Sequence, residues 1–344
     1  MRIPFLGPLA CALALATALA TALATPAAAQ APIVIKFSHV TTTDTPKGQG
    51  AERFKQLAEA RTNGAVKVEI YPNSTLYKDK EEVEMLQLGA VQMLAPSTSK
   101  FGPLGVKEYE AFDLPYIFPN EQVLRRVQDG PIGQGLFKKL ESKGITGLGY
   151  WDNGFKILTS NKPMHAPEDM RGLKFRIQSS KVLEAQFKQL GALPQVLAFS
   201  ELYQALQTGV VDGQENPPSN VTTQKLNEVQ KHATLTHHGY VGYAVIVNKG
   251  FWDGLPAGIR TMLEGAMTEA TAYEHEIADK QNAQALADIR ATGKTAVYTP
   301  TEAENAAWRK ALAPVQREMA SRVGKDLIAA LNKEAGAAGA APNN

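Results

Sequence analysis

Residues 33–40 read IVIKFSHV, and residues 41–46 continue TTTDTP. The first run is rich in β-branched residues and has the length of a strand, so it predicts a β-strand. The second run offers threonine and aspartate as N-caps and ends on Pro46, which suits the first turn of a helix. We therefore expect a helix directly after the strand, with apolar residues such as Phe54 and Leu57 on its buried face.

The alternation of strand and helix continues beyond this first helix. Val66, Val68 and Ile70 alternate with charged residues, which predicts a second strand. Residues 79–90 carry apolar side chains at helical spacing, and residues 92–95 are typical of a third strand. Strands joined by helices in this order indicate a parallel sheet with crossover connections.

A second α/β region is expected farther along the chain. Its strand candidates are residues 155–159, residues 173–177, a short strand from Val210 and a long extended segment at residues 232–249. Its helix candidates begin at Ser180 and at Phe199. Two longer helical patterns follow, from Pro256 to about Thr292 and from Thr301 to about Ala335.

This order of elements predicts two α/β domains, between which the chain crosses more than once. We expect domain I at residues 30–153 and about 242–281, and domain II at residues 154–241 and about 282–335. The helix from Pro256 would span both domains at a hinge, and residues 336–344 would form a disordered tail. Small-molecule sites favour such clefts between domains.

The first 29 residues differ in composition from the rest of the chain. Arg2 precedes an alanine- and leucine-rich stretch that ends in small residues before Gln30. This pattern is typical of a secretory signal cleaved after Ala29, and the alternative is a membrane anchor. Cleavage would remove Cys11, the only cysteine in the sequence, so we expect an exported, cysteine-free protein.

Composition excludes several classes of function. The chain of 344 residues carries 36 basic and 34 acidic residues, a net charge of +2, which argues against nucleic acid as a partner. The sequence contains neither a nucleophile-elbow motif nor a P-loop, and its glycine pairs do not complete a dinucleotide-binding fingerprint. The six histidines lack metal-site spacing. We expect no catalytic residue, no cofactor and no metal.

Cations follow several of the predicted strands. Lys47, Lys100 and Lys156 come shortly after strand candidates, and Arg176 lies at the end of another. In open α/β sheets, ligands bind beyond the carboxyl ends of parallel strands, and arginine can hold a carboxylate with two hydrogen bonds. Converging cations would suit a ligand with two carboxylates. The alternative for each cation is a solvated or paired surface position, and for Ser97 it is a turn or a helix cap.

Two motifs carry a family resemblance. Residues 201–217, ELYQALQTGVVDGQENP, and residues 172–177, GLKFRI, closely resemble signatures of solute-binding proteins of tripartite ATP-independent periplasmic (TRAP) transporters. Residues 45–48, 99–105 and 150–154 resemble the branch of that family that binds four-carbon dicarboxylates. The resemblance implies a two-domain periplasmic-binding-protein clamshell, with mixed sheets, helices on both faces and a long hinge-spanning helix.

The resemblance also implies roles for individual residues. Arg176 would hold one ligand carboxylate with two hydrogen bonds, and Asn216 would bind the same carboxylate. Lys47, Lys100 and Lys156 would bind, as a group, the second carboxylate and the intervening hydroxyl. Ser97 and His238 are further candidates for ligand contact.

The function implied is capture of malate, succinate or fumarate by domain closure, and delivery to membrane-embedded permease subunits. We expect a periplasmic monomer that is not an enzyme. The alternatives are a binding protein for another organic acid, such as a monocarboxylate or an oxoacid, and a secreted α/β enzyme that acts on a small acid. A binding protein that feeds a sensor kinase is a third possibility.

Overall fold

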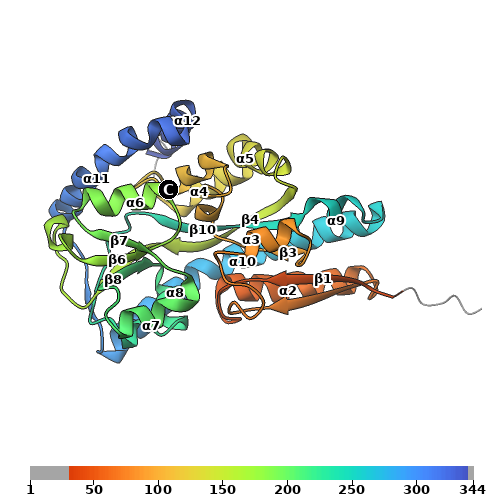
Figure 1. Ribbon diagram of the computed structural model, residues 1–344, viewed down its shortest axis with the longest axis horizontal. Helices are drawn as coiled ribbons and strands as arrows, with labels where there is room; N and C mark the ends of the chain where they lie inside the picture. The colour runs from red at the N-terminus through yellow and green to blue at the C-terminus, as the bar shows by residue number, and fades with distance from the viewer. Residues whose placement is uncertain (1–30, 340–344) are drawn as a thin grey trace, which may run out of the picture.

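The computed structural model describes residues 31–339, which contain two β-sheets covered by helices (Figure 1). The first sheet has the strand order β2-β1-β3-β10-β4. Its strands are β1 (Ile33–Ser38), β2 (Val66–Tyr71), β3 (Met93–Leu94), β4 (Ile145–Phe155) and β10 (Tyr240–Asn248). Strand β1 pairs parallel with β2 and β3, as the sequence predicted, whereas β10 pairs antiparallel with β3 and β4.

The second sheet has the strand order β11-β9-β5-β8-β6-β7. Its strands are β5 (Ile157–Ser160), β6 (Lys174–Ile177), β7 (Leu193–Val196), β8 (Gly213–Asn216), β9 (His232–Thr234) and β11 (Ala296–Tyr298). Strand β6 pairs parallel with β7 and β8, and β5 pairs antiparallel with β8 and β9. Both sheets are therefore mixed.

Helices connect the strands and cover both sheets (Figure 1). The α-helices are α2 (Pro46–Arg61), α3 (Glu82–Gln87), α4 (Glu121–Asp129), α5 (Pro131–Glu141), α6 (Lys181–Gln189), α7 (Leu202–Gln207), α8 (Pro218–Thr223), α9 (Lys249–Asp253), α10 (Ala257–Thr292), α11 (Glu302–Val323) and α12 (Lys325–Gly339). The 3-10 helices are η1 (Thr98–Lys100), η2 (Lys107–Asp113), η3 (Pro167–Met170), η4 (Phe199–Glu201) and η5 (Leu226–Glu228).

Within residues 31–339, the chain passes between the two sheets at three places. Lys156 alone separates β4 from β5, and residues 235–239 separate β9 from β10. The third connection is α10, a single helix of 36 residues. Near its start, Leu263 and Met267 pack in the core beside the first sheet, whereas Ile289 near its end packs in the core beside the second sheet. The predicted helix that spans both regions is confirmed.

Two strand predictions were wrong. Residues 232–249 are not one extended segment, because His237 adopts a positive φ of 45° and the chain turns there from the second sheet to the first. The short strand expected from Val210 begins at Gly213 instead.

The C-terminal helical pattern divides at Gly324, which has a φ of 109° and ends α11. Residues 336–339, which we expected in a disordered tail, continue α12 to Gly339. Residues 340–344 and the predicted signal segment with Ala29 lie outside the described residues.

Within residues 31–339, no helix is both long and apolar enough to cross a membrane. The same residues contain no group of three histidine, cysteine, aspartate or glutamate side chains arranged to hold a metal ion.

Candidate functional site

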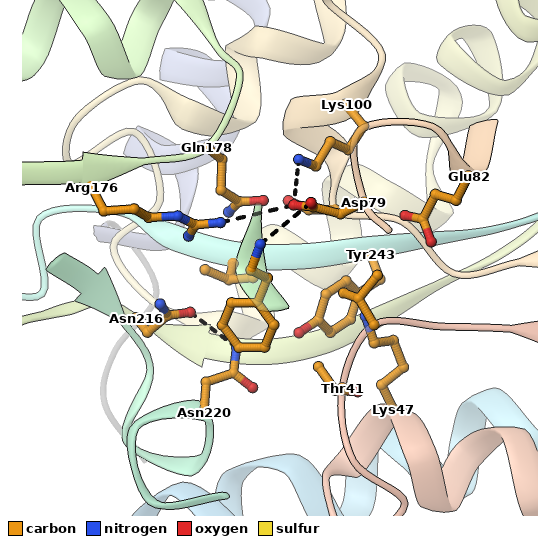
Figure 2. Close-up of a pocket in the computed structure, with 14 residues that line it drawn as sticks. Thr41, Lys47, Asp79, Glu82, Lys100, Arg176, Gln178, Asn216, Asn220 and Tyr243 are labelled. Atoms are coloured by element: carbon orange, nitrogen blue, oxygen red, sulfur yellow. Dashed lines mark hydrogen bonds and ion pairs between the residues drawn. The ribbon is translucent and has the colours of Figure 1, made fainter. Parts of the chain in front are cut away.

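A small cavity, lined by residues that follow or belong to strands of both sheets, lies between the two sheets (Figure 2). The carboxyl ends of β1 and β3 from the first sheet, and of β6 and β8 from the second, meet around it. Its lining residues are Val40, Thr41, Lys47, Asp79, Glu82, Ser97, Lys100, Arg176, Gln178, Phe199, Asn216, Asn220, Val241 and Tyr243. Five of the seven residues predicted to contact a ligand are therefore brought together.

Lys47 enters the cavity from the first turn of α2 and is fully buried. Its Nζ donates to Ala95 O at 3.2 Å and lies 3.8 Å from the centre of the Tyr243 ring. Burial lowers the pKa of Lys47 to about 8. The preceding loop folds tightly against α2 at Gly48, where a Cβ atom would lie 2.4 Å from Thr42 O. A glycine is therefore required beside Lys47.

Lys100 and Asp79 form a buried ion pair in the lining of the cavity. Lys100 Nζ lies 2.7 Å from Asp79 Oδ2, and the backbone N–H of Phe199 donates to Asp79 Oδ1 at 3.3 Å. Burial alone would raise the pKa of Asp79, but the charges of Lys100 and Arg176 outweigh it and hold this pKa below its usual value. Asp79 thus connects the first half of the chain with a backbone group beside the second sheet.

Arg176 projects into the cavity from β6 with 2% of its surface exposed. Its Nε donates to Leu197 O at 3.0 Å, and its Nη2 lies 3.8 Å from Asp79 Oδ2. Nη2 makes no hydrogen bond to any residue that the structure describes. A buried guanidinium with a free N–H edge is suited to bind a carboxylate.

Asn216 belongs to a chain of buried amides at the end of β8. Its Nδ2 donates to Gln214 Oε1 at 2.6 Å, and its Oδ1 accepts from Asn220 Nδ2 at 3.0 Å. Asn220 lies one turn farther on, in α8. These bonds fix the Asn216 side chain at the edge of the cavity near Arg176 (Figure 2).

Glu82 and Ser97 complete the polar lining on the side of the first sheet. Neither carboxyl oxygen of Glu82 has a hydrogen-bond partner within residues 31–339, and burial raises the pKa of Glu82 to about 7. Ser97 is 8% exposed and its Oγ lies 3.4 Å from Ser99 Oγ.

Lys156 and His238, both predicted to contact a ligand, are not among the residues that line the cavity. Both bind Glu215 instead: Lys156 Nζ lies 2.8 Å from Oε1, and His238 Nε2 lies 2.7 Å from Oε2. The physical reason is that Glu215 is itself buried, so each of its carboxylate oxygens needs a partner: Lys156 pairs with one, and His238 contacts the other.

The sequence profile of a bacterial family matches residues 37–322, which are most of the chain. That family is described as bacterial extracellular solute-binding protein, family 7 (DctP). The chain belongs to this family. Family 7 membership agrees with the resemblance noted in the sequence.

Among the related proteins, the C4-dicarboxylate-binding periplasmic protein DctP of Rhodobacter capsulatus is 64% identical over 304 residues, which cover 88% of this chain and 91% of that protein. The C4-dicarboxylate-binding protein DctB of Bacillus subtilis is 41% identical over 300 residues, which cover 87% of this chain and 85% of that protein.

Solved structures of TRAP periplasmic solute-binding proteins share the fold of this family 7 chain. The protein from Sulfurospirillum deleyianum, with bound succinate, is 48% identical with a TM-score of 0.85, over 87% of this chain and 98% of that one. The protein from Pseudomonas aeruginosa, with bound L-malate, is 44% identical with a TM-score of 0.81, over 83% of this chain and 100% of that one. The predicted two-domain solute-binding fold is confirmed.

Reasoning from the sequence missed several residues that line the cavity of this family 7 protein. Among them are Asp79, Glu82, Asn220 and Tyr243. Asn220 could have been found from its spacing of four residues from Asn216 across the start of a helix. The two acids could not, because a search for an anion-binding site looks for cations.

Proposed function

We propose that this family 7 protein binds C4-dicarboxylates of the succinate, malate and fumarate type in the cavity and delivers them to the membrane permease of a TRAP transporter. The observation that carries the proposal is the convergence of Lys47, Lys100 and Arg176, all buried, on one cavity between the sheets. The names and bound ligands of the similar proteins support the same substrate class.

The two ends of the ligand are assigned to different halves of the molecule. Arg176 and Asn216 from the second sheet bind one carboxylate, and Lys47, Lys100 and Ser97 beside the first sheet bind the other. Lys156 and His238 act indirectly, by holding Glu215 next to Asn216.

The two halves close around the ligand, and this closed form is the one that the permease recognises. Ion pairs strengthen when water leaves the cavity, because the local dielectric constant falls. The ligand favours the closed form only by its higher affinity for that form. The closed surface then docks on the permease, and the ligand leaves chemically unchanged. The protein acts in the periplasm as a monomer, after the signal segment has been removed by cleavage after Ala29.

A thermal-shift panel tests the substrate class. Succinate, malate and fumarate should raise the melting temperature, whereas lactate, pyruvate and galactonate should not. Arg176→Ala should abolish the shift, because it removes the guanidinium that binds one carboxylate, and Arg171→Ala at an exposed position should leave it unchanged.

A shift with a monocarboxylate, or with a sugar acid, in place of the dicarboxylates would reject this substrate class. Conversion of the ligand into another compound during incubation would indicate an enzyme instead.

A further inference from the structure

The two acids in the cavity are held in different ways. Asp79 pairs with Lys100 at 2.7 Å and accepts a backbone hydrogen bond from Phe199. Glu82 is 1% exposed, yet neither of its oxygens has a partner within the described part of the chain. A buried carboxylate without a hydrogen bond or a direct counter-ion is costly in its charged form. The ion pair with Lys100 explains why Asp79 can be buried as a carboxylate. The burial of Glu82 without a partner needs a different explanation.

Charged groups face Glu82 from each neighbouring element. They are Lys47 from α2, Lys100 from η1 and Asp79 from the loop before α3, with Arg176 from β6 on the opposite wall (Figure 2). The neutral phenol of Tyr243, from β10, lies beside Lys47. None of them forms an ion pair with Glu82 among the described residues. Lys47 donates to Ala95 O instead, and Lys100 is engaged with Asp79. Burial, only partly offset by Lys47, favours the neutral acid.

The charges around the cavity can be balanced in two ways. Lys47, Lys100 and Arg176 contribute three positive charges, and Asp79 contributes one negative charge. With an ionised Glu82 the lining has a net charge of +1, which matches a monoanion. With a protonated Glu82 the lining has a net charge of +2, which matches a dianion. A closed cavity of low dielectric constant favours the balanced arrangement.

We propose that Glu82 takes up a proton when a dicarboxylate binds, and that its carboxyl O–H then donates a hydrogen bond to the ligand. The proton comes from solvent and returns to solvent when the cavity opens and the ligand leaves. This inference rests on the proposed dicarboxylate function and makes Glu82 a specificity residue. It discriminates dianions from monoanions by its own protonation state.

Calorimetric titration with succinate at pH 7.5, in buffers of different ionisation enthalpy, measures the proton uptake. The wild-type protein should take up a fraction of one proton per ligand bound. Its Kd should rise with pH above about 7, by at most about tenfold per pH unit, because one linked proton sets that limit.

Two variants isolate the source of the proton. Glu82→Gln should bind succinate with uptake near zero and a flat pH profile, because the amide N–H₂ replaces the donating O–H without titrating. Glu84→Gln, an exposed glutamate on the same helix, should behave like the wild type.

The outcomes separate this inference from the function on which it rests. Succinate binding without proton uptake in the wild type overturns the role of Glu82 and leaves the function intact. Undiminished uptake in Glu82→Gln also overturns it, because Lys47 would then be the group that gains the proton. Failure of every dicarboxylate to bind the wild type rejects the function itself.

Infrared difference spectra provide a second measurement that does not depend on the folding of a variant. In the difference between the complex with ¹³C-labelled succinate and the free wild-type protein, the unlabelled protonated carboxyl band should increase, while the contribution of Glu274 cancels. The absence of that increase contradicts the proposal.

Discussion

At the scale of single residues, Glu215 shows how a buried charge is stabilised behind the cavity. Burial alone would raise its pKa, but Lys156 and His238 outweigh burial and lower the pKa of Glu215 to about 2. Thr236 fixes the His238 ring through a 2.7 Å contact with Nδ1. Because the pKa is depressed on folding, this carboxylate stabilises the protein above its unfolded pKa of about 4.5. That contribution is lost as the pH falls from there toward about 2.

Replacing Lys156 by methionine should destabilise the protein by about 3–5 kcal/mol at neutral pH, because Glu215 then remains buried without its lysine partner. Urea unfolding at pH 7 measures the loss, with Lys162→Met at an exposed position as the control. The double variant Lys156→Met, Glu215→Leu should recover much of the stability. A loss below about 1 kcal/mol would show that the pair contributes little.

The sequence predicted the cations of the site and not its acids. Lys47, Lys100 and Arg176 follow or end strands, and the rule that ligands bind at the carboxyl ends of strands locates them. Lys100 lines the cavity, whereas Lys156 is directed toward Glu215 and does not. This difference depends on the direction in which each side chain points. A motif does not contain that information.

At the scale of elements, helix α10 carries a buried acid at its centre. Glu274 is fully buried, and its Oε2 accepts the backbone N–H of Asp152 at 2.9 Å. A Cβ atom at Gly50 would lie 3.0 Å from Glu274 Cγ, so this glycine lets α2 approach α10 closely. Burial, reinforced by Asp152, raises the pKa of Glu274 well above its usual value, so the neutral acid is the folded form.

Glu274→Gln should preserve stability and change its pH dependence. Above about pH 4.5, Glu274 loses its proton in the unfolded protein but keeps it in the folded protein, where its pKa is raised. The free energy of unfolding of the wild type therefore falls as the pH rises above about 4.5. Glutamine resembles the neutral acid and does not titrate. The stability of the variant relative to the wild type should therefore increase with pH, which chemical denaturation from pH 5 to 8 measures. A constant difference would mean that Glu274 is ionised in the folded protein.

Elements with a strong local sequence pattern were predicted correctly. Element boundaries that depend on the backbone conformation of a single residue were not. The helix from Pro256 follows from a long periodic pattern, strand β1 from a run of β-branched residues, and strand β2 from the alternation of apolar and charged residues. The break between β9 and β10 depends on the positive φ of His237, and composition gives no sign of it in a run of β-formers.

At the scale of the whole molecule, the site depends on elements from both sheets. In the part of the chain that the structure describes, the backbone crosses between the sheets three times, and the residues that line the cavity come from both halves. Helix α11 packs against α6 and η2, and Arg322 of α11 pairs with Glu110 of η2. Proposed closure must therefore bring together side chains that are distant in sequence, while α10 links the cores beside both sheets.

One dicarboxylate is proposed to span the cavity between these two halves. The most direct test is a crystal structure of the protein with bound succinate. One carboxylate should lie within about 3 Å of Arg176 Nη2, and the other within the same distance of Lys47 or Lys100 Nζ. Succinate bound elsewhere, or with a single carboxylate held while the other faces solvent, would contradict the account.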